Sequence, residues 1–175
     1  MNTMAYALFI NRNDIIKNSP LQGALDADAL LPFIRTAQDK YLKNLLGTVL
    51  FEYLQAQIEA GTVGNLSAYY QDLLDDHIKN TLIWYSCVEY IPFSSIQFKS
   101  NGAVKQQSEQ ASAPSKTEID YLLQKAQENG DYYALRLQNY LIAYSNQIPQ
   151  YLQSVGNQTQ IYPDQTNQYT INLVL

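Results

Sequence analysis

The sequence has very little cysteine and histidine, two side chains that enzymes often use as nucleophiles, bases or metal ligands. Its 175 residues include one cysteine, Cys87, and one histidine, His77. A single cysteine excludes an internal disulfide and is compatible with synthesis in a reducing cytoplasm. A zinc site needs three or four ligands. Two residues ten positions apart on one helix lie about 15 Å apart along its axis, too far for a Cys–His pair. We therefore expect Cys87 in the core and His77 on a helix flank.

The glycine-dependent motifs of phosphate and acyl-transfer chemistry are also missing. Segment 61–64 lacks the lysine and the spacing of a phosphate-binding loop, and the sequence contains neither G-x-G-x-x-G nor G-x-S-x-G. The densest polar cluster is Asp75-Asp76-His77, where adjacent helical side chains point about 100° apart and do not converge on a metal ion. We predict a solvated helix face there, with no catalytic residues, metal or cofactor. The alternative is a small hydrolase that uses Asp75 and Asp76.

Charged side chains are scarce. Asp, Glu, Lys and Arg make up 15% of the sequence, and the formal net charge is −5. Because nucleic-acid binding requires clustered Lys and Arg and the eleven basic residues are scattered, we expect no specific nucleic-acid binding. The longest apolar runs, such as 29–34, are too short to cross a bilayer. Residues 1–6 lack the basic region of a signal peptide. We expect a soluble protein made in a cytoplasm.

Glutamine and asparagine supply the polarity instead, and tyrosine supplies most of the aromatic side chains. The sequence contains fifteen Tyr, and tyrosine is enriched at protein interfaces because it buries a large ring while its hydroxyl stays hydrated. Two interpretations are open: the tyrosines line the edges of the core, or a good share of them lie at subunit contacts. The scarcity of charged residues is compatible with tyrosines at subunit contacts.

Apolar residues recur at three- and four-residue steps over most of the chain, which is typical of amphipathic helices. The predicted fold class is all-α: a helical bundle of about five helices with one β-hairpin and extended N- and C-terminal arms. The predicted helices span residues 28–46, 48–60, 66–90, 115–129 and 132–146. The predicted domains are an arm at 1–27, a helical domain at 28–150 and an arm at 151–175.

Three local signals set the predicted helix ends. Gly47 is predicted to end the first helix in a left-handed C′ conformation. Gly130 is predicted to break the pattern between the last two helices. Ser115 and Glu118 have the spacing of a capping box, in which each side chain accepts an exposed backbone amide.

The periodicity changes between residues 94 and 114. Short apolar stretches flank Asn101-Gly102, and Asn-Gly is the strongest short-range hairpin signal because both residues tolerate positive φ. Residues 107–114 are small and polar. A segment this polar adds little to a core, so we predict that the hairpin and loop at 94–114 project and contact an adjacent subunit or ring. The predicted interaction residues are Ile96, Phe98, Asn101, Gly102 and Val104.

The C-terminal residues alternate between apolar and polar, as a strand with one apolar face does. A lone strand must pair with a sheet edge or remain disordered. We predict that it docks on a neighbouring protein by strand addition; a frayed tail is the alternative. The predicted interaction residues are Tyr169, Ile171, Leu173 and Leu175.

Three groups of motifs resemble a known family. Phe33–Leu42 and Leu45–Leu54 follow an I-x-x-A-Q … L-G-x-x-L-[FY] helix–break–helix signature. The Asn101-Gly102 hairpin precedes a Ser/Gln-rich loop, and Tyr132–Leu141 leads to Ile148-Pro149. Over about residues 10–150 the chain resembles the head-to-tail connector (adaptor) proteins of tailed bacteriophages, in particular those of the crAss-like phages that infect Bacteroides.

The resemblance implies a ring of helical subunits, commonly a dodecamer, beneath the portal of a virion. Such a ring joins the capsid to the tail and surrounds the channel through which DNA leaves the head. Its partners would be further copies of the chain, the portal protein and the next tail or ring protein, with no membrane. The protein would be made in the host cytoplasm and located at the head–tail junction. Another tail-completion or stopper protein is an alternative of the same kind.

Overall fold

Helices carry the architecture of the part of the chain that the structure describes. The computed structural model describes residues 6–21, 27–94, 96–99, 102–105, 115–153 and 161–164. The elements in chain order are α1 (Arg12–Asn18), α2 (Ala27–Ala37), the π-helical segment η1 (Gln38–Leu42), α3 (Lys43–Glu59), the 3₁₀ turn η2 (Val63–Asn65), α4 (Ala68–Asp72), the π-helical segment η3 (Leu73–Ile78), α5 (Lys79–Tyr90), the 3₁₀ turn η4 (Ile91–Phe93), β1 (Ile96–Lys99), β2 (Gly102–Lys105) and α6 (Lys116–Ala143). No helix in these ranges is both long and apolar enough to span a membrane.

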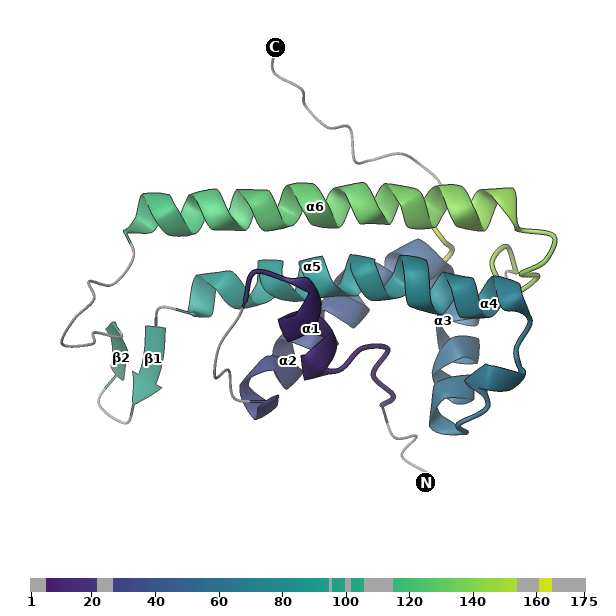
Figure 1. The fold of residues 1–175 in the computed structure, drawn as a ribbon, viewed down its shortest axis with the longest axis horizontal. Helices are drawn as coiled ribbons and strands as arrows, with labels where there is room; N and C mark the ends of the chain where they lie inside the picture. Colours follow the sequence, from purple (N-terminus) through teal and green to yellow (C-terminus); the bar gives the residue numbers. More distant parts are fainter. Residues whose placement is uncertain are drawn as a thin grey trace, which may run out of the picture.

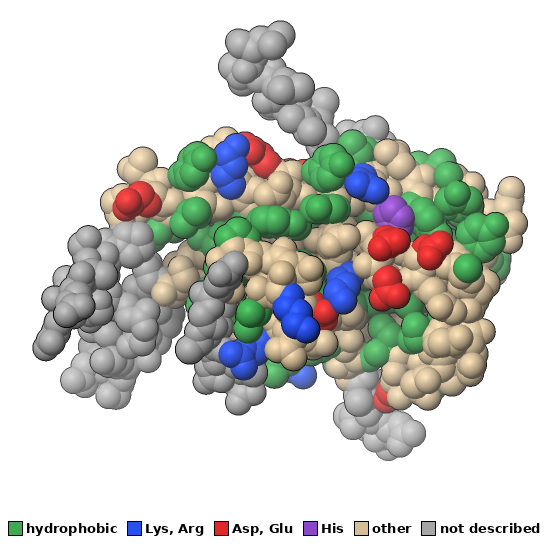
Figure 2. Space-filling view, in the orientation of Figure 1, with side chains coloured by type: hydrophobic (Ala, Val, Ile, Leu, Met, Phe, Trp, Pro, Cys, Tyr) green, Lys and Arg blue, Asp and Glu red, His purple; other side chains and the backbone are tan. Residues whose placement is uncertain are grey.

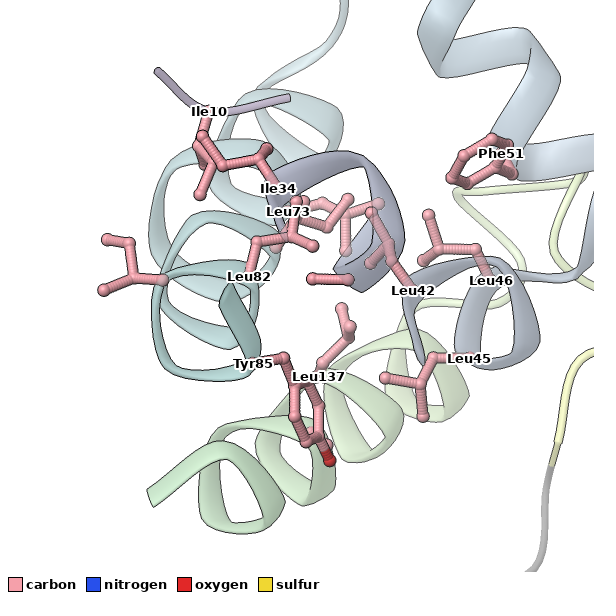
Figure 3. Close-up of a cluster of buried hydrophobic side chains, with 14 of the residues drawn as sticks. Ile10, Ile34, Leu42, Leu45, Leu46, Phe51, Leu73, Leu82, Tyr85 and Leu137 are labelled. Atoms are coloured by element: carbon pink, nitrogen blue, oxygen red, sulfur yellow. The ribbon is translucent and has the colours of Figure 1, made fainter. Parts of the chain in front are cut away.

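Helix α5 is the central element of the fold. It packs against α6 on one side and against α2 and α1 on the other (Figure 1). Nearly every side of α5 is therefore covered, and its buried positions include adjacent residues such as Leu82 and Ile83. A helix buried on all sides needs no polar face. Leu82, Leu42 and Leu137 bring α5, η1 and α6 into one continuous core (Figure 3).

Tyr85 of α5 joins the two sides of this core. Its ring stacks on Tyr41 of η1 with the ring centroids 4.0 Å apart. Its hydroxyl donates a hydrogen bond of 2.9 Å to a carboxylate oxygen of Asp131 in α6. The side chain is completely buried, so its hydroxyl needs such a partner. Tyr85 thereby fixes how η1, α5 and α6 lie against one another.

The predicted number of helices is wrong, and Gly130 is the main reason. About four long helical segments are present where about five were expected, because α6 runs without a break from Lys116 to Ala143. Gly130 is buried inside this helix, and a Cβ there would lie 2.8 Å from Cε1 of Tyr85. Glycine is thus required for close approach of a ring, not for a turn. The capping box of Ser115 and Glu118 at the start of α6 is confirmed.

The chain does turn at Gly47, but not in the predicted conformation. Gly47 has φ +74° and ψ +161°, a region open essentially to glycine alone and distinct from the left-handed helical C′ conformation. A kink therefore divides α3 just before Thr48. The first two predicted helices meet at this kink, which we call the Gly47 corner.

The prediction of a β-hairpin as a constituent of the fold is wrong, because the fold is built from helices with no sheet among its layers. The strands described between η4 and α6 are the four-residue β1 and β2, antiparallel to each other and paired with no other described strand. Two such strands are marginally stable in water without a further strand or a helix to pack on. This ladder does not define the fold class.

The N-terminal arm is not extended throughout as predicted, and described residues of both arms pack against the helices. In the N-terminal arm, α1 forms a helix with an Asn11–Asp14 capping box, and Ile10 and Ile15 are buried. In the C-terminal arm, Tyr151 and Pro163 are buried against the helices. Isolated apolar residues in both arms thus complete the core, which the sequence pattern alone did not indicate.

Candidate interaction surface

The predicted hairpin residues fall in the β1–β2 ladder. Ile96 and Phe98 lie on β1, and Gly102 and Val104 lie on β2; the register pairs Gln97 with Val104 and Lys99 with Gly102. Asn101 lies outside the described residues. The other predicted interaction residues, Tyr169, Ile171, Leu173 and Leu175, lie outside them as well. Their roles stay predictions.

The polar cluster on the α4–η3–α5 helix lies in the π-helical segment η3. Asp75 and Asp76 are exposed, as predicted for a solvated face. His77 is half-buried, with its ring centroid 4.2 Å from that of Tyr140. Burial lowers the pKa of His77, and the Arg136 charge lowers it further, while Asp76 and Asp72 act in the opposite direction. Figure 2 shows acidic side chains beside the histidine. No described group of three His, Cys, Asp or Glu side chains could hold a metal ion.

Cys87 is a core residue, as predicted, with 2% of its surface exposed. Burial raises the pKa of its thiol to about 11, although a hydrogen bond with Ser19 lowers it in part. The thiolate is the reactive form of cysteine. At neutral pH Cys87 is therefore a packed thiol.

The part of α6 that faces away from the core exposes large apolar side chains. Tyr121, Leu122, Tyr132 and Ile142 are 59%, 52%, 46% and 53% exposed, and we call them the α6 outer face. Tyr121 and Tyr132 lie opposite the buried positions of α6 (Ala126, Gly130, Ala134, Leu137 and Leu141), and Leu122 and Ile142 lie on the two flanks of this buried stripe. Figure 2 shows hydrophobic side chains along this helix, interspersed with a few charged ones.

Two basic residues accompany the tyrosines of the α6 outer face. Nζ of Lys125 lies 5.9 Å from the ring centroid of Tyr121, and Cζ of Arg136 lies 5.9 Å from that of Tyr132. Each pair is four residues apart, which places both side chains on the same side of the helix. The surface therefore combines apolar area with a few cations.

A second surface lies at the Gly47 corner, where residues 161–164 cross the helix. We call these four residues the C-terminal strap. Thr48 N donates to Ile161 O, and Ile161 N donates to Thr48 Oγ1, each over 2.9 Å. Asp164 N donates to Asn44 O over 2.9 Å. Pro163 occupies the space that a Cβ of Gly47 would need, with Cδ 2.6 Å from that position.

Two buried glutamines anchor the chain ends. Gln138 of α6 donates from Nε2 to Asp164 O over 2.9 Å. Gln38 of η1 accepts from Phe9 N over 2.9 Å and donates to Ala7 O over 3.3 Å. Both glutamines are at most 2% exposed. Neutral amides thus hold both terminal segments without the desolvation cost of a buried charge.

The sequence interpretation missed these glutamines and Thr48. Gln38 lies four residues after Ile34 and four before Leu42, inside the apolar stripe of its helix. Gln138 lies four residues after Ala134, in the stripe of α6. A polar residue at a core position of a helix is the signal that could have identified both.

Residues 42–161 match the family of unknown function DUF6712, and the chain belongs to this family. The matched span begins at the end of η1, before the Gly47 corner, and ends at the first residue of the C-terminal strap. No curated protein and no solved structure matches the chain.

Proposed function

We propose that the chain is a structural subunit of a phage head-to-tail connector, whose copies form a ring beneath the portal. The ring joins the capsid to the tail and surrounds the DNA exit channel. The resemblance of residues 33–54 and 132–149 to such proteins supports this class. The observation that favours assembly most directly is the α6 outer face, where four large apolar side chains are exposed along one helix.

Burial of the α6 outer face would stabilise a subunit contact. Single exposed apolar side chains are common on monomers, but here Tyr121, Leu122, Tyr132 and Ile142 are all exposed on one helix, outside its buried stripe. Burial of apolar surface contributes about 25 cal/mol per Å². Tyrosine and arginine are enriched in interfaces, so Tyr132 with Arg136 suits a partly hydrated contact.

The net charge of the chain is compatible with a channel that binds DNA weakly. A ring of subunits with a formal charge of −5 each repels the phosphate backbone, and such repulsion opposes counterion-driven binding. We expect no measurable affinity of the isolated protein for duplex DNA at physiological salt in an anisotropy assay.

Co-expression with the portal protein of the same genome tests the proposal. We expect a closed ring of this chain on the portal in negative-stain micrographs, and a complex of matching mass by native mass spectrometry. A chain that stays monomeric in the presence of that portal would overturn the proposal.

A pair of lysine variants tests the α6 outer face separately. Leu122→Lys should reduce the ring fraction at least tenfold while thermal unfolding stays close to that of the wild type, because Leu122 is already half exposed. Ala56→Lys, at an exposed position of α3, adds the same charge elsewhere and should leave the ring intact. Equal effects of both variants would show that charge, not the α6 outer face, matters.

A further inference from the structure

The C-terminal strap replaces one hydrogen bond of a helix. In an uninterrupted helix, Thr48 N would donate to Asn44 O, four residues earlier. At the Gly47 corner this pair is open: Thr48 N donates to Ile161 O, while Asn44 O accepts from Asp164 N. The four residues of the strap thus bridge the two backbone groups that one helical hydrogen bond would have joined. Both groups keep a partner, as buried backbone groups require.

The groups that bind the strap at the Gly47 corner form a slot. They recognise the backbone of the strap and its proline. Two of these groups are main-chain atoms, of Thr48 and Asn44, and two are side chains, Thr48 Oγ1 and Gln138 Nε2. The absent Cβ of Gly47 leaves room for the ring of Pro163. These groups recognise an extended segment with proline at its third position, whichever copy of the chain supplies it.

We propose that this slot is an exchange site between copies, in which residues 161–164 of one subunit occupy the Gly47 corner of its neighbour. The ligand is the same segment in both arrangements, so the exchange conserves every contact in the slot. Seven residues, 154–160, connect the strap to residue 153, which follows the turns after α6. Short connections of this kind favour exchange of a terminal segment between subunits.

Two features favour the exchanged arrangement once subunits are adjacent. Ile161 and Tyr162 flank the buried Pro163 but are 39% and 52% exposed, so a neighbouring subunit has apolar surface to cover. The neighbour's slot is also present at high effective concentration in a ring. This second argument rests on the proposed connector function; the recognition chemistry of the slot does not.

Disulfide trapping between two differently marked copies tests the exchange. One copy carries Asn44→Cys and the other Asp164→Cys, and both carry Cys87→Ser so that no native thiol remains. The hydrogen bond between Asp164 N and Asn44 O keeps the two Cα atoms within disulfide reach. Mixed, refolded together and oxidised, the two copies should form a covalent heterodimer.

Two controls define the result. A chain with both cysteines should close internally when dilute and form covalent multimers when concentrated. In the second control, the copy with Asn44→Cys is mixed with a copy that carries Asn139→Cys, at an exposed position of α6, in place of Asp164→Cys. This mixture should give no heterodimer. If Asn44→Cys and Asp164→Cys also give no heterodimer in concentrated mixtures, the exchange is overturned, whether or not the double-cysteine chain closes internally. The trapping omits the portal, so a heterodimer without a portal ring would contradict the connector function alone.

Discussion

The Gly47 corner and the α5–α6 contact at Gly130 both place another part of the chain where a glycine lacks its Cβ. Cδ of Pro163 lies 2.6 Å from the Cβ position of Gly47, and Cε1 of Tyr85 lies 2.8 Å from that of Gly130. The backbones differ: Gly47 has φ +74°, while Gly130 is helical. Gly47 is therefore required twice, for its backbone and for its neighbour, whereas Gly130 is required only for its neighbour.

This difference matters because the two requirements respond differently to substitution. A positive φ strains any residue with a Cβ regardless of the space around it. A crowded helical position is strained only as far as the neighbouring ring resists displacement. Substitutions at the two glycines should therefore differ in size and in what relieves them.

The largest expected effect is that of Gly47→Ala. Backbone strain and displacement of Pro163 together should lower the free energy of unfolding by on the order of 3 kcal/mol, measured by urea denaturation. Gly61→Ala is the matched control, since Gly61 has φ +66° and nothing within 4 Å of its Cβ position. It should cost only about 1 kcal/mol. Equal losses would mean that the strap contact at Gly47 contributes nothing.

Gly130→Ala should have an intermediate effect. The methyl group would meet the ring of Tyr85, which is held by its stack on Tyr41 and its bond to Asp131. Overpacking costs about 1–3 kcal/mol, and alanine returns about 1 kcal/mol of helix propensity, so we expect a net loss of about 1 kcal/mol. Combination with Tyr85→Leu should make Gly130→Ala neutral or stabilising. An additive double variant would argue against the ring contact.

Gln138→Leu should have a smaller effect, confined to the strap. It removes the hydrogen bond to Asp164 O, but it also removes Oε1 of Gln138, a buried oxygen with no hydrogen-bond partner among the described residues. We expect a loss of about 0.5–1 kcal/mol. Because Gly47→Ala already displaces the strap, the two losses should combine less than additively. Full additivity in denaturation would separate Gln138 from the Gly47 corner.

The smallest expected effect is a pH dependence of stability at the contact between η3 and α6, where His77 packs on Tyr140. The pKa of His77 is lowered in the folded protein, chiefly by burial, so the unfolded chain binds the proton more readily. Stability should therefore fall as the pH drops below the ordinary histidine value of about 6.5. His77→Gln should flatten that part of the stability–pH curve, measured by thermal unfolding. Parallel curves would show that His77 does not contribute.

Local sequence signals predicted the helical character of the chain with some success. The capping box at Ser115 and Glu118, the long helical stretch that ends near Pro92 and the burial of Cys87 are all present. Each depends on residues within a few positions of one another or on a regular apolar spacing. The predicted roles of the hairpin and of Tyr169 to Leu175 depend on neighbours outside the chain and remain predictions.

The sequence by itself determined most of the helical stretches and marked Gly47 and Gly130 as special positions, because propensity, capping and periodicity act over a few residues. Only the tertiary structure decided what each glycine is for. Gly130 lies inside a helix and leaves room for the ring of Tyr85 from α5. At Gly47 a helical hydrogen bond is open, and a segment more than a hundred residues later completes it: Ile161 and Thr48 are 113 positions apart. Such partners leave no local periodicity, since hydrogen-bond geometry and close packing are settled only when distant segments meet.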